Sequence, residues 1–427
     1  MRIVLATFGS LGDLHPVIAL GLELQRRGHH ASIVTSEYHR ERILATGLGF
    51  HDAAPDLRPD DKAFIRATMD ERRGPEAIVR FMLRHLPQMY ADYERAINAD
   101  GGADLLITSD LAYAGPVLAE KTGIDWASQV LSPLSFVSAY DESVLPPLPW
   151  LWRLKALGPR AYGSILGLAK RAARRLSGPV TEFRRSLGLP PKRDALFDDK
   201  HSPSLVLAMF SRLLGEPRPD WPSQTVVTGF ALYDGVSPSL PQDIRRFIAG
   251  GERPIVFTLG SAAVLDPGLF FIESARAAAA IGRRALLIGD AERGALPRAD
   301  ANLGVFGYAP FSELFPRAAA IVHQGGSGTT GQAMRAGRPM LIVPYAHDQP
   351  DNALRAKKLG ISDTIARRQY SARRAARALQ RLLDDETVAT RAGEVGKTVA
   401  EENGAASAAD AIERTFSGSA NLARATG

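Results

Sequence analysis

Residues 323–352 read HQGGSGTTGQAMRAGRPMLIVPYAHDQPDN, and they predict a strand, a glycine-rich turn and a helix in succession. An apolar run over residues 318–322 leads into His323. The small residues of the turn come next: Gly325, Gly326, Ser327, Gly328 and Thr329. A helix that begins in such a turn binds anions, because its first amides point outward and its dipole favours negative charge. Glycines let the backbone approach a ligand closely, so the stretch predicts a phosphate site.

A second apolar run, over residues 340–343, ends just before a turn in which Asp348 and Gln349 follow His347. Carboxylate and amide side chains bind hydroxyl groups through hydrogen bonds. Both turns follow predicted strands, and ligands bind at the carboxyl ends of the strands in open parallel sheets. The two turns together predict a ligand with a phosphate at one end and a polyol at the other.

The composition of the chain limits its class. Its 427 residues are enough for two or three domains at about 150 residues each. The absence of cysteine excludes disulfides, thiolate catalysis and cysteine zinc sites. The N-terminal apolar run is too short for a signal peptide, and no run approaches the ~20 apolar residues of a membrane span. We therefore expect a cytoplasmic protein.

Charge and motif content argue against several kinds of site. The net charge of +6 is mild and no recognised nucleic-acid motif accompanies it, so we expect no nucleic-acid partner. The sequence has no HExxH motif, and no Asp-x-Asp triplet that would hold a metal-bound diphosphate. We expect a site without a metal or a cofactor, in which helix N-termini and His323 neutralise the phosphates.

Apolar runs alternate with segments of helical period in both halves of the chain, which predicts parallel sheets covered by helices on both faces. We expect an N-terminal domain over residues 1–215 and a second domain over 236–404, joined by a proline-rich linker over 216–235. A strand over 225–228 is expected to open the second domain. Residues 405–427 are expected to form a C-terminal helix and tail.

A basic stretch over residues 151–185 has two interpretations. No acidic residue occurs between positions 143 and 181, while several arginines and lysines alternate with leucines and a tryptophan. A basic amphipathic helix can lie on an anionic membrane, here at the inner membrane surface. Alternatively, its apolar side packs against its own domain and its basic side faces solvent.

Acidic and histidine residues follow the first predicted strands. Asp13 and His15 lie between the first strand and the first helix, and either is a candidate general base. Asp110 follows the strand over 105–108 and is a candidate second acid at the same sheet edge. The structural alternatives are an N-cap for Asp13 and Asp110 and a polar helix start for His15. In the second half, Ser261 follows a predicted strand through Gly260, as in a phosphate-binding turn, and is a candidate phosphate ligand.

One competing motif is present. Gly326, Gly328 and Gly331 have the spacing of the dinucleotide fingerprint of nicotinamide-dependent dehydrogenases. The match falls late in its predicted domain, whereas the fingerprint normally opens the first strand–helix turn. The acid expected after the next strand is replaced by Pro344 and Tyr345.

The stretch from His323 to Asn352 resembles the sugar-donor signature of the family 1 glycosyltransferases of bacteria, which are UDP-glycosyltransferase-like. The matching residues after the glycine-rich turn are Ala336, Gly337, Pro339, His347, Asp348, Gln349, Asp351 and Asn352. The turn GSLGDLHP over residues 9–16 extends the resemblance along most of the chain, apart from 55–101 and 133–200. The resemblance implies an α/β protein of the GT-B fold: two Rossmann-like, doubly wound domains that face a central cleft. The first would bind the acceptor and the second the nucleotide sugar.

The resemblance also implies roles for individual residues. His323 and the amides after it would bind a diphosphate, and Ser261 would contact a phosphate. Asp348 and Gln349 would bind the sugar hydroxyls. Tyr308 and Ala309 would contact the nucleotide base. Plant-type members have a histidine at the position of Asp13, and bacterial antibiotic and sterol glycosyltransferases have an aspartate there. The resemblance therefore favours Asp13 as the base, with His15 second.

Plant-type members also carry a glutamate that binds the ribose hydroxyls at the position where this chain has Gly331. Without that glutamate the donor can be a dTDP-sugar, whose nucleoside sugar lacks one hydroxyl, as well as a UDP-sugar. The sequence is similar, too, to bacterial rhamnosyltransferases that act on lipids. We expect inverting, metal-independent sugar transfer from a UDP- or dTDP-sugar to a hydroxyl of a mainly apolar small-molecule or lipid acceptor. The alternatives are an epimerase or hydrolase of the GT-B fold, a nicotinamide-dependent dehydrogenase, and an inactive sensor of nucleotide sugars.

Overall fold

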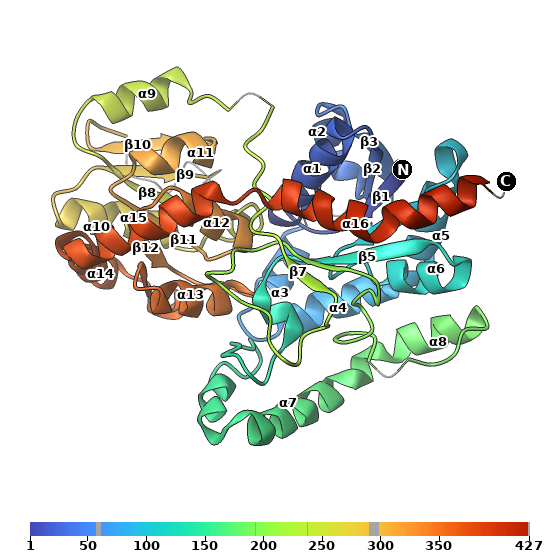
Figure 1. Ribbon diagram of the computed structural model, residues 1–427. Helices are drawn as coiled ribbons and strands as arrows, with labels where there is room; N and C mark the ends of the chain where they lie inside the picture. Colours follow the sequence, from blue (N-terminus) through green and yellow to red (C-terminus); the bar gives the residue numbers. More distant parts are fainter. Residues whose placement is uncertain (57–60, 193, 237, 290–298, 426–427) are drawn as a thin grey trace. The chain divides into compact units, whose positions relative to one another are not determined.

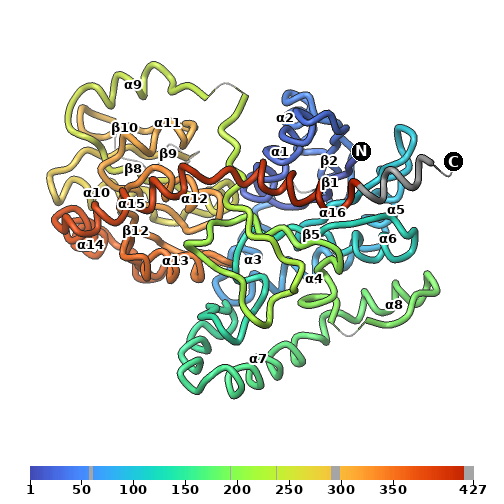
Figure 2. Tube along the Cα trace, in the orientation of Figure 1, coloured from blue at the N-terminus to red at the C-terminus, as the bar shows by residue number. Residues whose placement is uncertain are grey.

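A computed structural model of the chain describes residues 1–56, 61–192, 194–236, 238–289 and 299–425 (Figures 1 and 2). Its contacts divide the chain into two compact units, and each is interrupted in the sequence. The first unit comprises Met1–Arg58, Pro75–Tyr233 and Asn403–Gly427. The second comprises Pro59–Gly74 and Asp234–Glu402.

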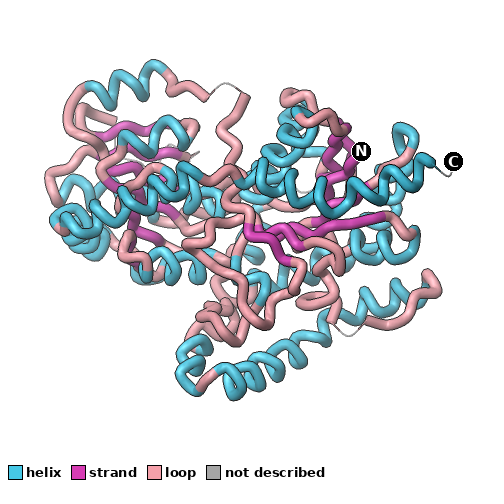
Figure 3. The backbone as a smooth tube through the Cα atoms, in the orientation of Figure 1, coloured by secondary structure: helices cyan, strands magenta, loops and turns pink. Residues whose placement is uncertain are grey.

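The first unit is built on a seven-stranded parallel sheet with the order β3-β2-β1-β4-β5-β6-β7. Its strands are β1 Arg2–Ala6, β2 His30–Thr35, β3 Gly49–Asp52, β4 Leu105–Thr108, β5 Asp125–Val130, β6 Val206–Ala208 and β7 Thr225–Val227. Its α-helices are α1 Leu11–Arg26, α2 Arg40–Leu44, α4 Gly74–Arg84, α5 Leu86–Asn98, α6 Ala114–Thr122, α7 Pro159–Ala173, α8 Gly178–Ser186 and α16 Gly404–Ala425. Helices cover both faces, and each face has its own apolar core (Figure 3).

The C-terminal helix α16 belongs to the first unit, where it packs along α1 (Figure 1). Ile412 and Phe416 of α16 are buried in the core that α1 also lines. Arg27, at the end of α1, donates to Asp410 at 2.6 Å and to Glu413 at 2.8 Å. The chain therefore returns to the first unit after it has completed the second.

The strand expected to open the second domain instead completes the first sheet. Strand β7 pairs in parallel with β6, and Val226 lies opposite Leu207. The expected linker before it is part of the same unit, because Trp221 is buried and stacks on Phe136 with ring centroids 4.1 Å apart. The proline-rich composition indicated a linker, but the aromatic and apolar residues within it supply core contacts.

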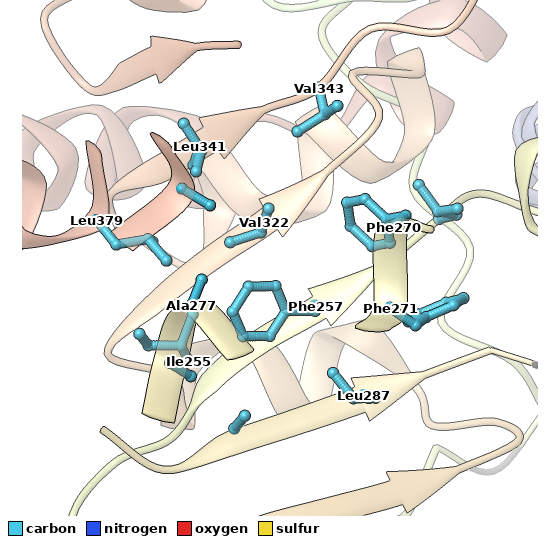
Figure 4. Packing of buried hydrophobic residues seen from close by; sticks show 14 of the residues in the cluster. Ile255, Phe257, Phe270, Phe271, Ala277, Leu287, Val322, Leu341, Val343 and Leu379 are labelled. Carbon is cyan, nitrogen blue, oxygen red and sulfur yellow. The ribbon is translucent and has the colours of Figure 1, made fainter. Parts of the chain in front are cut away.

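The second unit contains a six-stranded parallel sheet with the order β10-β9-β8-β11-β12-β13. Its strands are β8 Ile255–Thr258, β9 Ala285–Ile288, β10 Leu303–Phe306, β11 Ala320–His323, β12 Met340–Ile342 and β13 Ser362–Thr364. Its α-helices are α3 Lys62–Thr68, α9 Gln242–Ala249, α10 Phe270–Ala280, α11 Phe311–Leu314, α12 Ser327–Arg335, α13 Gln349–Lys358, α14 Ala372–Asp384 and α15 Glu386–Glu401. Phe257, Val322 and Leu341 of adjacent strands pack beneath α10 and α14 (Figure 4).

The basic stretch is partly self-packed. Tyr162 and Leu166 of α7 are buried in a small apolar cluster with Leu151. The opposite side remains open to solvent: Leu157 is 62% exposed and Leu168 is 68% exposed. Within the part of the chain that the structure describes, no helix has both the length and the hydropathy to cross a membrane.

Candidate functional site

The glycine-rich turn lies between β11 and α12, as the sequence predicts. Gly325 has a φ of +92°, and a Cβ at this position would lie 2.8 Å from a methyl carbon of Ile342. Only glycine fits this conformation without strain. Gly326 is the N-cap of α12, so the cap residue itself has no side chain to offer to the amides of the first turn. The amides of residues 327–329 thus open a helix whose dipole favours an anion.

His323 ends β11 and has a fully buried ring. Its Nδ1 accepts a hydrogen bond from the Gly325 amide at 3.1 Å, and its Nε2 lies 3.3 Å from the sulfur of Met340. Burial lowers the pKa of His323 to about 3, so the ring is neutral at physiological pH. Burial thus favours the neutral ring, and the neutralisation of a phosphate by His323 stays a prediction. In the structure the ring holds the turn through the Gly325 amide.

Gln324 joins this turn to the one that follows β8. Its side chain is buried, and its Nε2 would lie 2.1 Å from a Cβ at Gly260 and 2.8 Å from one at Gly326. Glycine at both positions leaves room for the amide. Its Oε1 is buried without a hydrogen-bond partner among the described residues. The half-buried Ser261 follows Gly260, so the structure brings Ser261 and the start of α12 to one place. Gln324 lies inside the glycine-rich motif, and that was the only sequence signal for it.

Asp348 connects the glycine-rich turn to the start of α13. Its Oδ2 accepts hydrogen bonds from the Ser327 hydroxyl at 3.0 Å and from the Asn352 amide at 2.8 Å. Asn352 also donates to the Gly325 carbonyl at 2.9 Å. Burial raises the pKa of Asp348, although the bonds from Ser327 and Asn352 oppose that shift. The two predicted binding turns are thus cross-linked by hydrogen bonds.

Gln349 shapes the turn before it. Its Oε1 accepts from the amides of Tyr345 at 2.8 Å and Ala346 at 3.1 Å. With the oxygen used in this way, the side chain presents its amide nitrogen to a ligand as a hydrogen-bond donor.

Tyr308 and Ala309 follow β10 at the same edge of the sheet. Tyr308 is 68% exposed, whereas Ala309 is buried. In the sheet order, β10 is three strands from β11, which corresponds to about 14 Å at the usual strand spacing. The structure therefore places these two residues along the same edge but not in contact with the group around Ser327.

Asp13 lies in the first turn of α1, in the first unit. Ser10 is the N-cap, so the interpretation of Asp13 as the N-cap is wrong. Asp13 completes a capping box: its Oδ2 accepts from the Ser10 amide at 2.8 Å and from the Ser10 hydroxyl at 3.2 Å. His39, at the end of the 3-10 helix Glu37–His39 that follows β2, supports the same turn, since its Nε2 lies 3.1 Å from the Gly9 carbonyl.

His15 lies two residues further into α1. Its ring meets that of Tyr233 edge-on, with centroids 5.3 Å apart. Residues two apart on a helix point in different directions, so Asp13 and His15 do not face each other.

Asp110, the candidate second acid, contacts Lys200 and Ser135 in the structure. Its Oδ1 pairs with the ammonium group of Lys200 at 2.9 Å, and its Oδ2 accepts a hydrogen bond from Ser135. Burial raises the pKa of Asp110, but Lys200, His201 and Ser135 outweigh this and hold it below its ordinary value. Asp110 is therefore an ionised partner of Lys200, a contact that no sequence pattern indicated.

Comparison with known proteins identifies the family. Residues 3–138 match the model of the glycosyltransferase family 28 N-terminal domain, and residues 286–413 match that of the erythromycin biosynthesis protein CIII-like C-terminal domain. The chain is 34% identical to O-mycaminosyltylonolide 6-deoxyallosyltransferase of Streptomyces fradiae, over 97% of both chains. The chain belongs to the antibiotic and sterol glycosyltransferases.

Two further relatives support the assignment. The chain is 30% identical to the sterol 3-beta-glucosyltransferase of Cryptococcus neoformans over 97% of its own length, and it spans 27% of that longer protein. The structure of glycosyltransferase VinC in complex with dTDP matches with a TM-score of 0.68 and 21% identity, covering 98% of this chain and all of that one. This likeness confirms the GT-B fold of two parallel-sheet α/β domains. The enzyme is thus a glycosyltransferase and not a nicotinamide-dependent dehydrogenase.

Buried histidines predict a loss of stability in acid. Burial lowers the pKa of His323 to about 3, and it is the largest cause of the fall to about 4 for His201 and His347. An unfolded histidine titrates near pH ~6.5, so below that pH the folded state binds fewer protons than the unfolded state. The stability that these neutral rings provide is complete above pH ~6.5 and falls as the pH drops toward the folded pKa values.

We expect His323→Gln to reduce this acid sensitivity, because it removes one of the depressed histidines. The free energy of unfolding should then change less steeply between about pH 6.5 and 4, by up to ~1.4 kcal/mol per pH unit. Denaturant unfolding of both proteins at several pH values measures the slopes. Equal slopes would show that His323 is not neutral and buried as described.

Proposed function

We propose that the enzyme transfers a sugar from a dTDP- or UDP-linked donor to a hydroxyl of a mainly apolar acceptor, with inversion and without a metal or cofactor. The observation that carries this proposal is the cross-linked group at the carboxyl edge of the second sheet, where the Ser327 hydroxyl donates to Asp348 at 3.0 Å beside the glycine N-cap of α12. The relative from S. fradiae is named as a deoxysugar transferase, and VinC has been solved with dTDP.

In this proposal the nucleotide sugar lies along the strand ends of the second unit. The first amides of α12 and the Ser261 hydroxyl bind the diphosphate, while His323 holds the turn that presents those amides. Asp348 and Gln349 bind the sugar hydroxyls. Tyr308 and Ala309 contact the nucleotide base. They follow β10, three strands from β11, and a nucleotide sugar has its base and its sugar at opposite ends.

The acceptor hydroxyl loses its proton to Asp13 in this mechanism. The oxygen then attacks the anomeric carbon from the face opposite the leaving diphosphate, so the configuration inverts. Negative charge grows on the diphosphate as the bond breaks, and the fixed amides of α12 stabilise it without reorganising. This electrostatic role is what allows transfer without a metal.

A panel of nucleotides tests the sugar-donor site. We expect dTDP or UDP, but not NAD, to raise the melting temperature, because a ligand that binds only the folded state stabilises it. Sugar transfer should continue in excess EDTA, since helix amides carry the diphosphate. Loss of activity in EDTA that Mg²⁺ or Mn²⁺ restores would contradict metal independence, and stabilisation by NAD alone would contradict the whole assignment.

The base is tested by two matched substitutions. We expect Asp13→Asn to lower kcat by about 10²–10⁴-fold, the usual contribution of a general base. Asparagine keeps an oxygen that can accept from the Ser10 amide, so the start of α1 should survive. His15→Gln should retain most activity. If His15→Gln is inactive and Asp13→Asn is not, His15 is the base.

The acceptor side of the proposal rests on residues 143–181. Trp150, Leu157 and Leu168 are exposed there, and the exposed Arg160 and Arg171 form none of the ion pairs found among the described residues. Exposed apolar groups beside unpaired cations suit an apolar or lipid acceptor and contact with an anionic membrane surface. We expect apolar alcohols to be glycosylated in preference to free sugars, and the enzyme to sediment with anionic but not neutral vesicles. If only free sugars are glycosylated, the apolar acceptor is contradicted. If the enzyme does not sediment with anionic vesicles, the membrane contact is contradicted.

A further inference from the structure

Residues 61–74 belong to the second unit, although the sequence on both sides of them belongs to the first. Asp61 caps α3 by accepting a hydrogen bond from the Phe64 amide at 2.9 Å. Ile65 and Met69 are buried in the core of the second unit, which also includes Tyr345. Burying two large apolar side chains stabilises such a contact by a few kcal/mol. This short segment is therefore an integral part of the unit that contains the candidate sugar-donor site.

Arg367 ties the segment to the turn before α13. Its Nη2 donates to the carbonyl and the carboxylate of Asp266 at 2.8 and 2.7 Å, and its Nη1 lies 3.5 Å from the Met69 carbonyl. Its guanidinium carbon lies 4.0 Å from the centre of the Tyr345 ring. The Tyr345 hydroxyl in turn donates to the Pro267 carbonyl at 3.0 Å. Tyr345, the first residue of the turn, is thus fixed from several sides.

His347, in the middle of this turn, also contacts the segment. It has a φ of +58°, a left-handed conformation that costs a residue other than glycine about 1 kcal/mol or more. Burial lowers the pKa of its ring, and a hydrogen bond to the backbone of Thr68 opposes that shift. The ring of His347 thus faces the backbone of Thr68, while Ile65 and Met69 of the segment pack in the same core as Tyr345.

Ala346 lies near the end of the segment. A Cβ added to Gly74 would lie 3.7 Å from the Ala346 Cβ, so the glycine backbone comes close to Ala346. The segment therefore reaches Tyr345, Ala346 and His347 in succession. The next two residues are Asp348 and Gln349, the proposed ligands of the sugar hydroxyls. Because Gln349 accepts from the amides of Tyr345 and Ala346, a shift of the turn moves Gln349 as well.

We propose that residues 61–74 hold the 345–349 turn in the shape that recognises the sugar, so that a determinant of sugar-donor specificity lies in the N-terminal half of the sequence. The proposal rests on the proposed function. It assigns positioning roles to His347 and to the segment around Thr68, and direct contact with the sugar to Asp348 and Gln349.

Two substitutions at one position test the contact. Asparagine and glycine both accept a left-handed backbone, but neither reaches Thr68 as the histidine ring does. We expect His347→Asn and His347→Gly to raise the KM for the nucleotide sugar roughly three- to tenfold, as the loss of one buried hydrogen bond does. The Kd for plain dTDP or UDP should stay within about twofold, because the diphosphate site lies in the other turn. A merely structural defect would weaken both ligands together.

A control variant is available at a residue that contacts the same segment. Arg368 pairs with Glu71 at 3.2 Å, and the Arg368 side chain is 72% exposed. An exposed pair of this kind contributes little, so Arg368→Ala should leave both ligands unaffected. If the histidine variants bind the nucleotide sugar as the parent protein does, His347 does not position the turn and the proposal is overturned.

An exchange of residues 61–74 tests the specificity itself. Replacing this segment with that of a family member that uses another sugar should change the ranking of nucleotide sugars and leave the ranking of acceptors intact. A changed acceptor ranking with an unchanged sugar ranking would overturn the proposal and assign the segment to the acceptor. Failure of the parent protein to bind dTDP or UDP would instead contradict the proposed function.

Discussion

The hydrogen bonds of the Asp348 carboxylate fix the geometry on which the candidate sugar-donor site depends. Ser327 and Asn352 both donate to the same oxygen, and Asn352 also holds the Gly325 carbonyl. One carboxylate and one amide thus tie the first turn of α12 to the first turn of α13. Since the two turns follow adjacent strands of one parallel sheet, a ligand across them meets helix amides and hydroxyl-binding side chains in a fixed relation.

The proposed diphosphate site relies on the backbone amides of the glycine-rich turn and of the start of α12. His323 is neutral because it is buried, and its Nδ1 is occupied by the Gly325 amide. The attraction must then come from oriented backbone dipoles, which are fixed before the ligand arrives. Such a site suits a leaving group whose charge grows during the reaction, because the amides gain most in the transition state. A buried histidine that shapes the turn is part of this arrangement.

Local sequence was sufficient wherever a signal and its structure lie close together in the chain. The run from His323 to Asn352 predicted β11, the turn, α12 and β12, because glycine, apolar period and helix start are all local properties. It could not predict that Asp110 pairs with Lys200, 90 positions away. Strand β7 was assigned to the wrong unit because the proline-rich residues before it have the composition of a linker. In the structure Trp221, one of these residues, stacks on Phe136 of the first unit. No local sequence pattern indicates that residues 61–74 belong to the second unit.

Asp13 shows how a structural and a chemical role can share one carboxylate. Its Oδ2 completes the capping box with Ser10, which orients the side chain. A carboxylate has two oxygens, and the proposed base role is assigned to the one outside the capping box. The capping bonds also fix where that second oxygen points. Histidine at the same position, as in plant-type relatives, would have to be oriented by a separate partner, whereas here the helix start itself supplies the orientation.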